Sequence, residues 1–261
     1  MSDSPKKSTS SKSSSEQENP LANIVLNVLA PVIILSYCSK DGNSLWHLGP
    51  YKAMALAIAI PVLYGIWHFI QFKKFNIFSA VGFGNVLLTG AISIYLYAND
   101  DPEVRKNTPI LFGIKEALQP LILGSLFLIT AKSKSPLFNA FIYNDGLFDR
   151  SRINKAIKAN GKESELQQLL WKSTLMFFGS FCISAVMNLF LAQYFLGPEK
   201  LDPADENWKQ IYNEANGKIM GWGFLVIGVP ILIIGGFILS KLIKGLKELT
   251  GLETDRVLQA R

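Results

Sequence analysis

The chain has 261 residues, of which 49% are hydrophobic and only 18% are charged, and its formal net charge at pH 7 is +6. Charged residues make up about a quarter of an ordinary soluble domain, so this composition indicates a protein that keeps much apolar surface. The positive charge does not indicate a nucleic-acid-binding protein, because the basic residues lie in several separate loops and not on one predicted face.

The first segment, residues 1–19, is rich in Ser and Lys and has no apolar anchor. A segment of this composition cannot offset the entropy that ordering would cost. We therefore expect residues 1–19 to be a disordered cytoplasmic leader that carries no domain.

Six apolar stretches follow, and each is near the roughly 20 residues that a helix needs to cross about 30 Å of hydrocarbon. They cover residues 21–38, 51–71, 76–98, 109–131, 171–196 and 219–240. A soluble bundle of six long buried helices would need amphipathic partners to cover them, and a chain of this length has no room for such partners. We therefore predict an all-α, polytopic membrane protein with about six transmembrane helices in a domain over residues 20–242.

The lysines and arginines of the connecting segments predict the orientation of these helices. With the N-terminus in the cytoplasm, seventeen of them lie on the cytoplasmic side and six lie outside. Cytoplasmic loops of membrane proteins carry an excess of Lys and Arg. We therefore predict a multi-pass protein of the inner membrane with both termini in the cytoplasm, the C-terminal one as a basic tail over residues 243–261.

The longest predicted cytoplasmic connection, residues 132–170, has structure of its own. Apolar residues recur there at helical spacing directly after a proline, at Leu137, Phe138, Phe141 and Ile142. This pattern predicts a short helix that lies against the lipid headgroups. The basic loop either only fixes the topology or has a regulatory or partner-binding role.

Turn and cap signals divide the same connection. The sequence NDG at 144–146 predicts a turn, and Gly161 is expected to end a second, basic helix in the left-handed conformation. Ser164 followed by Gln167 resembles a capping box that opens the helix of the fifth span.

The second half of the chain has features of an inverted copy of the first. Superposing the first and fourth spans by their prolines places Asn27 on Glu116, and the third and sixth spans carry GFG at 82–84 and GWG at 221–223. Three spans in each half would run in opposite directions. The fold class therefore includes a 3+3 inverted repeat, an arrangement that many secondary transporters use.

Two adjacent charges, Lys115 and Glu116, interrupt the fourth span. Neighbouring residues lie about 100° apart on a helix, so we expect their partners to come from elsewhere. Gln119 extends the same polar sector, and Pro120 frees the carbonyl of Glu116. Such a group is expected to face the bundle interior, either as a site for an ion, a proton or a polar headgroup, or as a structural ion pair with Lys115 reaching the interface.

Amides in other spans could complete such a site. Asn27 and Asn85 lie within predicted spans, where an amide usually forms hydrogen bonds across helices. No spacing of His, Cys or carboxylates is typical of a metal site, and no nucleophile motif is present. We therefore predict no catalytic residue, no metal and no cofactor, and the candidate binding residues are Glu116, Lys115, Gln119, Asn27 and Asn85.

Several short motifs occur in a characteristic order. They are NVLAP at 27–31, PVLYG at 61–65, LLTG at 87–90, KEALQPLILG at 115–124, SPLF at 135–138 and NLFLA at 188–192, followed by Trp208. In these motifs the chain resembles the bacterial intracellular septation protein A group and, more closely, a sister set of uncharacterised multi-spanning inner-membrane proteins. The resemblance covers about residues 20–242 and implies an integral inner-membrane protein with a loose link to envelope growth or division. The Ser/Lys leader and the longer inner and outer loops depart from that pattern.

We expect from these features a small transporter or lipid-handling protein with a polar site near Glu116, and not an enzyme. The alternative is a non-transporting scaffold that binds other envelope membrane proteins through its cytoplasmic loop. The lipid bilayer is a predicted partner and nucleic acid is not, and the sequence does not indicate a substrate.

Overall fold

The computed structural model describes residues 25–72, 77–99 and 101–259, and helices dominate this part of the chain. It contains no strand, and its one isolated β-bridge pairs Phe148 with Leu258. The helical elements are η1 (Val25–Leu29), α2 (Ala30–Ile33), η2 (Ile34–Cys38), α3 (Gly49–Phe72), α4 (Ile77–Ala98), α5 (Pro102–Lys106), α6 (Thr108–Thr130), α7 (Leu137–Phe141), α8 (Arg150–Ala159), α9 (Glu163–Leu196), α10 (Trp208–Val226), α11 (Gly228–Thr250) and α12 (Thr254–Val257).

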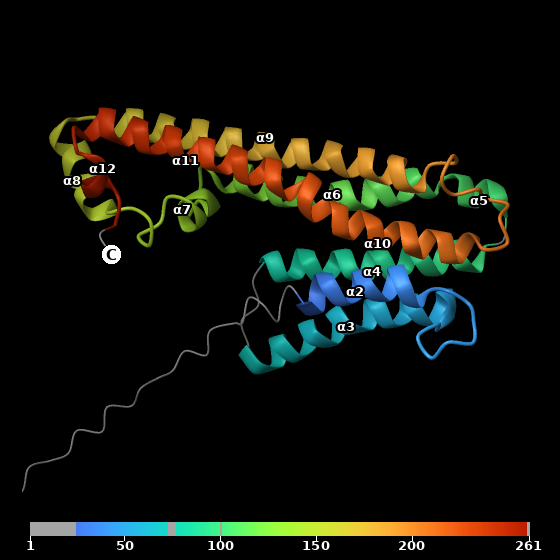
Figure 1. The fold of residues 1–261 in the computed structure, drawn as a ribbon. Helices are drawn as coiled ribbons and strands as arrows, with labels where there is room; N and C mark the ends of the chain where they lie inside the picture. Colours follow the sequence, from blue (N-terminus) through green and yellow to red (C-terminus); the bar gives the residue numbers. More distant parts are fainter. Residues whose placement is uncertain (1–24, 73–76, 100, 260–261) are drawn as a thin grey trace, which may run out of the picture.

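The long helices lie side by side along one axis (Figure 1). Helices α2, α3 and α4 form a layer against α6 and α10, while α9 and the α10–α11 pair run the full length of the molecule (Figure 1). The connections 39–48, 101–107 and 197–207 lie at one end, which we call the Glu103 end. The short helices α7, α8 and α12 lie at the other, which we call the C-terminal end.

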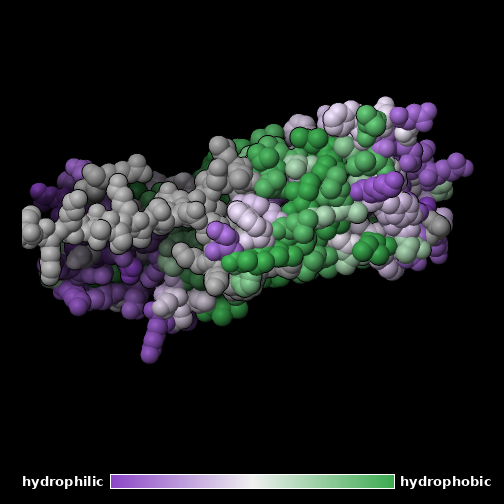
Figure 2. Space-filling model, turned by 90° about the horizontal axis from the view of Figure 1, so that it is seen from below, coloured by the Kyte–Doolittle hydropathy of each residue, from purple (hydrophilic) through white to green (hydrophobic). Residues whose placement is uncertain are grey.

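Four helical stretches in the described residues are long and apolar enough to cross a membrane: Gly49–Gln71, Thr108–Thr130, Glu163–Leu196 and Trp208–Thr250. The prediction of an all-helical chain with several helices of this kind is confirmed. Figure 2 shows a hydrophobic band between hydrophilic residues at both ends of the molecule. Side chains such as Ile94, Phe190 and Leu232 are more than two-thirds exposed, as lipid-facing residues of a membrane bundle are.

The predicted outer loop between the fifth and sixth spans is shorter than expected, because residues 208–218 are the first part of α10. Trp208, Tyr212, Ala215 and Ile219 are buried at helical spacing. The Lys, Gln, Asn and Glu residues between them lower the mean hydropathy of the segment, so it was not recognised as part of a span. The helix axis breaks at Ile227, between α10 and α11, just before Pro230.

Two hydrophobic cores stabilise the two ends. At the Glu103 end, Trp208 and Tyr212 pack with side chains of α3, α4 and α6. At the C-terminal end, α7, α8 and α12 pack against α9 and α11. The predicted helix after Pro136 is present as α7, but Phe138 is fully buried against Phe177 and does not face headgroups. The interfacial prediction is therefore wrong for Phe138, whereas Phe141 is about half exposed at 47%.

Local signals in the connection 132–170 have mixed outcomes. Asn144 accepts backbone hydrogen bonds from Gly146 and Leu147, so the predicted turn is present. Gly161 has φ +64° and ends α8 as predicted. The capping box is wrong, because α9 begins at Glu163 and no side chain caps its first turn.

The C-terminal segment is docked and is not a free tail. Helix α11 continues to Thr250, and backbone hydrogen bonds join Asp149 N to Val257 O at 3.0 Å and Gln259 N to Leu147 O at 3.0 Å. Val257 is fully buried beside α8. The C-terminal segment therefore completes the core of the C-terminal end, while the predicted leader, residues 1–19, lies outside the described residues.

Candidate functional site

Lys115 and Glu116 contact each other directly on α6, through Lys115 Nζ and Glu116 Oε1. This corrects the expectation that adjacent residues on a helix must find partners elsewhere. That expectation followed from the directions of the Cβ atoms, whereas the four-carbon stem of lysine is long enough to bend back to its neighbour. The Lys115 side chain is 1% exposed and that of Glu116 is 18% exposed, so lysine is the buried member of the pair.

The Lys115 ammonium has two further partners inside the bundle. It donates to Thr89 Oγ1 of α4 at 2.8 Å, and it lies 4.2 Å from the centroid of the Phe112 ring. A buried ammonium needs a counter-ion and further polar contacts to offset its lost hydration. Glu116, Thr89 and Phe112 supply these, so Lys115 points into the bundle and does not reach the interface.

Contacts one turn away fix how α4, α6 and α10 align. Tyr212 of α10 lies 3.2 Å from Ser93 of α4 through its hydroxyl, and its ring meets Phe112 of α6 edge-on at 6.4 Å. Helix α10 runs in the same direction as α6 and opposite to α4 (Figure 1). One turn further along each helix, the residues are therefore Thr89, Glu116 and Asn216.

Asn216, at the level of Thr89 and Glu116, has a buried side-chain donor without a hydrogen-bond partner among the described residues. Its residue is 1% exposed, and its Nδ2 donates to no described residue. Glu116 lies at the same level on α6, and its Oε2 has no hydrogen bond or ion pair to a described residue. We call Thr89, Lys115, Glu116 and Asn216 the Glu116 layer. It combines a cation, an anion and an amide donor within an apolar bundle.

Further polar contacts connect this region to the Glu103 end. Tyr97 of α4 donates to Asn213 Oδ1 of α10, and Asn213 Nδ2 donates to the carbonyl of Pro50 at 2.8 Å. Lys209 Nζ contacts the hydroxyl of Tyr51 at that same end. Polar side chains of α3, α4 and α10 therefore extend from the Glu116 layer toward one end of the bundle.

Two of the predicted amides lie on the opposite side of the layer. Asn85 is one turn from Thr89, whose hydroxyl donates to the Asn85 carbonyl at 2.8 Å, and Gln119 is one turn from Lys115. Both side chains are partly exposed, and neither amide forms a hydrogen bond to a described residue. They lie near enough in register to extend the layer but do not form it.

The structure separates Asn27 from the layer. Position 217 of α10 lies against Leu35 and Ser36, and position 221 lies against Val32, so the N-terminal helical segment runs antiparallel to α10. Asn27 is five residues beyond Val32, which places it on the order of 10–15 Å from Asn216 along the bundle axis. Asn27 has a partner of its own.

Sequence reasoning missed six polar residues of this region: Thr89, Ser93, Tyr97, Tyr212, Asn213 and Asn216. The last three lie in the segment assigned to an outer loop, and the spacing of Trp208, Tyr212, Ala215 and Ile219 was the signal that could have found them. Thr89 and Ser93 are ordinary residues of membrane helices, and only the packing of α4 on α6 and α10 gives them a role. Among the described residues, no cluster of His, Cys, Asp and Glu could hold a metal ion.

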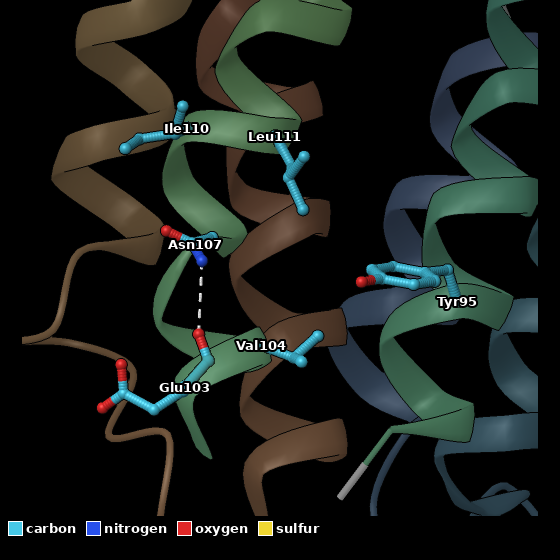
Figure 3. A pocket seen from close by; sticks show the side chains of 6 residues that line it. All are labelled: Tyr95, Glu103, Val104, Asn107, Ile110 and Leu111. Carbon is cyan, nitrogen blue, oxygen red and sulfur yellow. Dashed lines mark hydrogen bonds between the residues drawn. The ribbon is translucent and has the colours of Figure 1, made fainter. Parts of the chain in front are cut away.

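A pocket of about 580 Å³ lies between α4 and the α5–α6 segment at the Glu103 end. Figure 3 shows Tyr95, Val104 and Leu111 directed into the space between the helices, whereas Glu103, Asn107 and Ile110 project from the side of α5–α6 away from Tyr95. Tyr95 comes from α4, Glu103 and Val104 from α5, Asn107 from the junction, and Ile110 and Leu111 from α6. Leu111 is one turn from Lys115, so the pocket and the Glu116 layer are neighbours along α6.

Comparison of the chain with models of known protein families, with curated proteins and with solved structures finds no match. The arrangement of residues in the Glu116 layer and in the pocket is therefore the basis for assigning a function.

Proposed function

We propose that the chain is a small transporter or lipid-handling protein of the inner membrane that binds a polar group of its substrate in the Glu116 layer. The observation that carries this proposal is that a partly exposed carboxylate lies at the same level of the bundle as a buried amide whose Nδ2 has no partner among the described residues. An unsatisfied buried donor costs about 1–3 kcal/mol. A bound polar group that accepts from Asn216 Nδ2 and donates to Glu116 Oε2 would remove that cost.

The proposal includes six membrane crossings with both termini in the cytoplasm. Each predicted apolar stretch contains helix in the described residues, and the connections 39–48, 101–107 and 197–207 lie at one end while the connection 131–149 lies at the other (Figure 1). The sorting of seventeen basic residues to one side and six to the other supports placing the C-terminal end in the cytoplasm. The 3+3 inverted repeat remains part of the proposal, with η1–α4 and α6–α11 as its halves, each with a proline four residues after Asn27 or Glu116.

The second candidate function is a non-transporting scaffold that binds other envelope membrane proteins, as the resemblance to the septation protein A group implies. The folded C-terminal end favours it. Ile153 and Ile157 bury one face of α8, and this leaves Arg152, Lys155 and Lys158 exposed on a helix of fixed orientation. A basic helix face held in this way suits an acidic protein partner.

A ligand-dependent stability measurement separates the two functions. Purified protein in detergent is heated with amino acids, organic cations, organic anions and lipid headgroup analogues at two pH values, because a ligand that binds the native state raises the unfolding temperature. We expect at least one class to stabilise the wild type and Glu214→Gln but not Glu116→Gln. Glu214 is the control because it is a carboxylate of α10 outside the layer, bound to Gln210 at 3.0 Å. Equal stabilisation of all three proteins, or none in any, contradicts binding at the layer.

A further inference from the structure

The pocket at the Glu103 end has an apolar half and a polar edge. Val104, Leu111 and the ring of Tyr95 form its inner walls, and Ile110 lines it from the outer side of α6. Its outer edge carries the Glu103 carboxylate and the Asn107 amide, which project away from Tyr95, while the Tyr95 hydroxyl points between the helices (Figure 3). A pocket divided in this way suits an amphipathic molecule, with hydrocarbon inside and a polar group at the mouth.

The surroundings of the pocket indicate where that molecule comes from. Ile94 is 71% exposed, Ile110 57% and Ile114 49%, on the same α4 and α6 helices that form the pocket. In a chain that spans the membrane, these side chains face lipid, while Glu103 and the residues beside it belong to the polar connection at the helix ends. The pocket therefore opens at the level where hydrocarbon gives way to headgroups.

The polar edge is rich in acceptors. Asn107 Nδ2 donates to the Glu103 carbonyl at 3.2 Å, which leaves Asn107 Oδ1 free to accept. The Glu103 carboxylate has one loose ion pair, at 3.9 Å to Lys106, and both side chains are well exposed. Exposed pairs of this kind contribute little, so a ligand cation can replace Lys106. An edge that offers acceptors and one negative charge favours a headgroup with a primary ammonium, which is a triple donor.

The Glu116 layer lies beyond the Leu111 end of the pocket. Lys115 Nζ donates to Thr89 Oγ1 across the same pair of helices, α4 and α6, one turn beyond Leu111. Because Lys115 and Thr89 belong to the Glu116 layer, that layer begins one turn, roughly 6 Å along the helix, beyond Leu111. A chain held in the pocket therefore ends before the Glu116 layer, and the two sites have different occupants.

We propose that the pocket binds one hydrocarbon chain of an amine-bearing membrane lipid, with its ammonium group at Glu103 and Asn107. The chain lies against Val104, Leu111 and Tyr95, and the phosphate of the headgroup stays in the solvent at the Glu103 end. This site does not depend on the function proposed for the Glu116 layer.

The test uses the full chain in detergent and three lysophospholipids of one chain length, with ethanolamine, choline or glycerol headgroups. Native mass spectrometry counts the bound lipids at a series of concentrations. We expect one ethanolamine lipid to bind about tenfold more tightly than the other two, because only its ammonium donates hydrogen bonds to a carboxylate. Glu103→Gln is expected to remove this preference while one lipid still binds.

Matched variants locate the site. Ile110→Trp places a bulky ring in the lining of the pocket, whereas Ile114→Trp places the same ring on the same helix, one turn away and outside the lining. We expect Ile110→Trp to lose the bound lipid and Ile114→Trp and Glu116→Gln to keep it. Equal binding of the three headgroups by the wild type, or equal behaviour of the two tryptophan variants, overturns the proposal. Loss of binding in Glu116→Gln overturns the separation of the two sites.

Discussion

Removing the charge of Glu116 is expected to cost more stability than removing that of Lys115, although the two charges form one pair. Glu116→Gln leaves an ammonium whose side chain is 1% exposed, whereas Lys115→Met leaves a carboxylate that is 18% exposed and can be hydrated. Breaking a buried ion pair from one side costs about 3–5 kcal/mol. The stranded Lys115 keeps Thr89 and the Phe112 ring, so we expect about 3 kcal/mol for Glu116→Gln and about 1–2 kcal/mol for Lys115→Met.

The double variant Lys115→Met/Glu116→Gln removes both charges and should recover most of the loss. The assay is unfolding of purified protein in mixed micelles, followed by tryptophan fluorescence, at the same pH for all four members of the cycle. We expect a coupling energy of about 2–3 kcal/mol between the two positions, within the range for residues in contact. Additive losses, or a larger loss for Lys115→Met than for Glu116→Gln, would refute the reasoning from burial.

After the native cysteines are replaced, cysteines introduced at 45 and 103 should react with an impermeant thiol reagent on intact cells, and a cysteine introduced at 150 should not. Labelling of the cysteine at 150 would show that the protein has the opposite orientation. Phe138→Asp should lower the free energy of unfolding by about 3–5 kcal/mol and Phe141→Asp by less than about 1 kcal/mol, because only Phe138 is fully buried. Similar unfolding temperatures for the two variants would contradict that difference in burial. Asn216→Leu removes a buried donor that has no partner among the described residues, so the free energy of unfolding should stay equal or rise by up to about 1 kcal/mol. The same variant should no longer be stabilised by ligand. A clear loss of stability would indicate that this amide has a partner within the protein.

The helical fold could be predicted because its causes are local. An apolar run of about 20 residues in a membrane satisfies its backbone only as a helix, and α3, α4 and α6 begin and end within two residues of the predicted stretches. Gly161 ends α8 because its left-handed conformation suits glycine. The first part of α10, residues 208–218, was missed because its buried stripe lies among polar residues, so that only the spacing of the buried residues, and not the mean hydropathy, reveals it.

The candidate site could be predicted only in part, because it depends on how helices pack. Charges at Lys115 and Glu116 within an apolar run were enough to mark α6 as the helix of interest. That Lys115 reaches Thr89, and that Asn216 lies at the level of Glu116, depends on the relative positions of α4, α6 and α10. Nothing local in those helices fixes that alignment. Asn27 shows the converse, since a motif shared with Glu116 did not bring the two residues together.

The docking of the C-terminal segment has a consequence for the order in which the protein matures. Residues 254–259 are synthesised after every other described element, yet Val257 fills the core formed by Phe148, Ile153 and Ile157, and Gln259 pairs with the backbone of Leu147. During synthesis, α8 therefore emerges long before the segment that covers it, and its apolar face stays open to chaperones and proteases until the last helix has been made. A ribosome that stalls before residue 254 leaves a chain with its long apolar helices complete and this core uncovered. Chains that lack residues 254–259 therefore differ from chains that contain them in exposing the apolar face of α8.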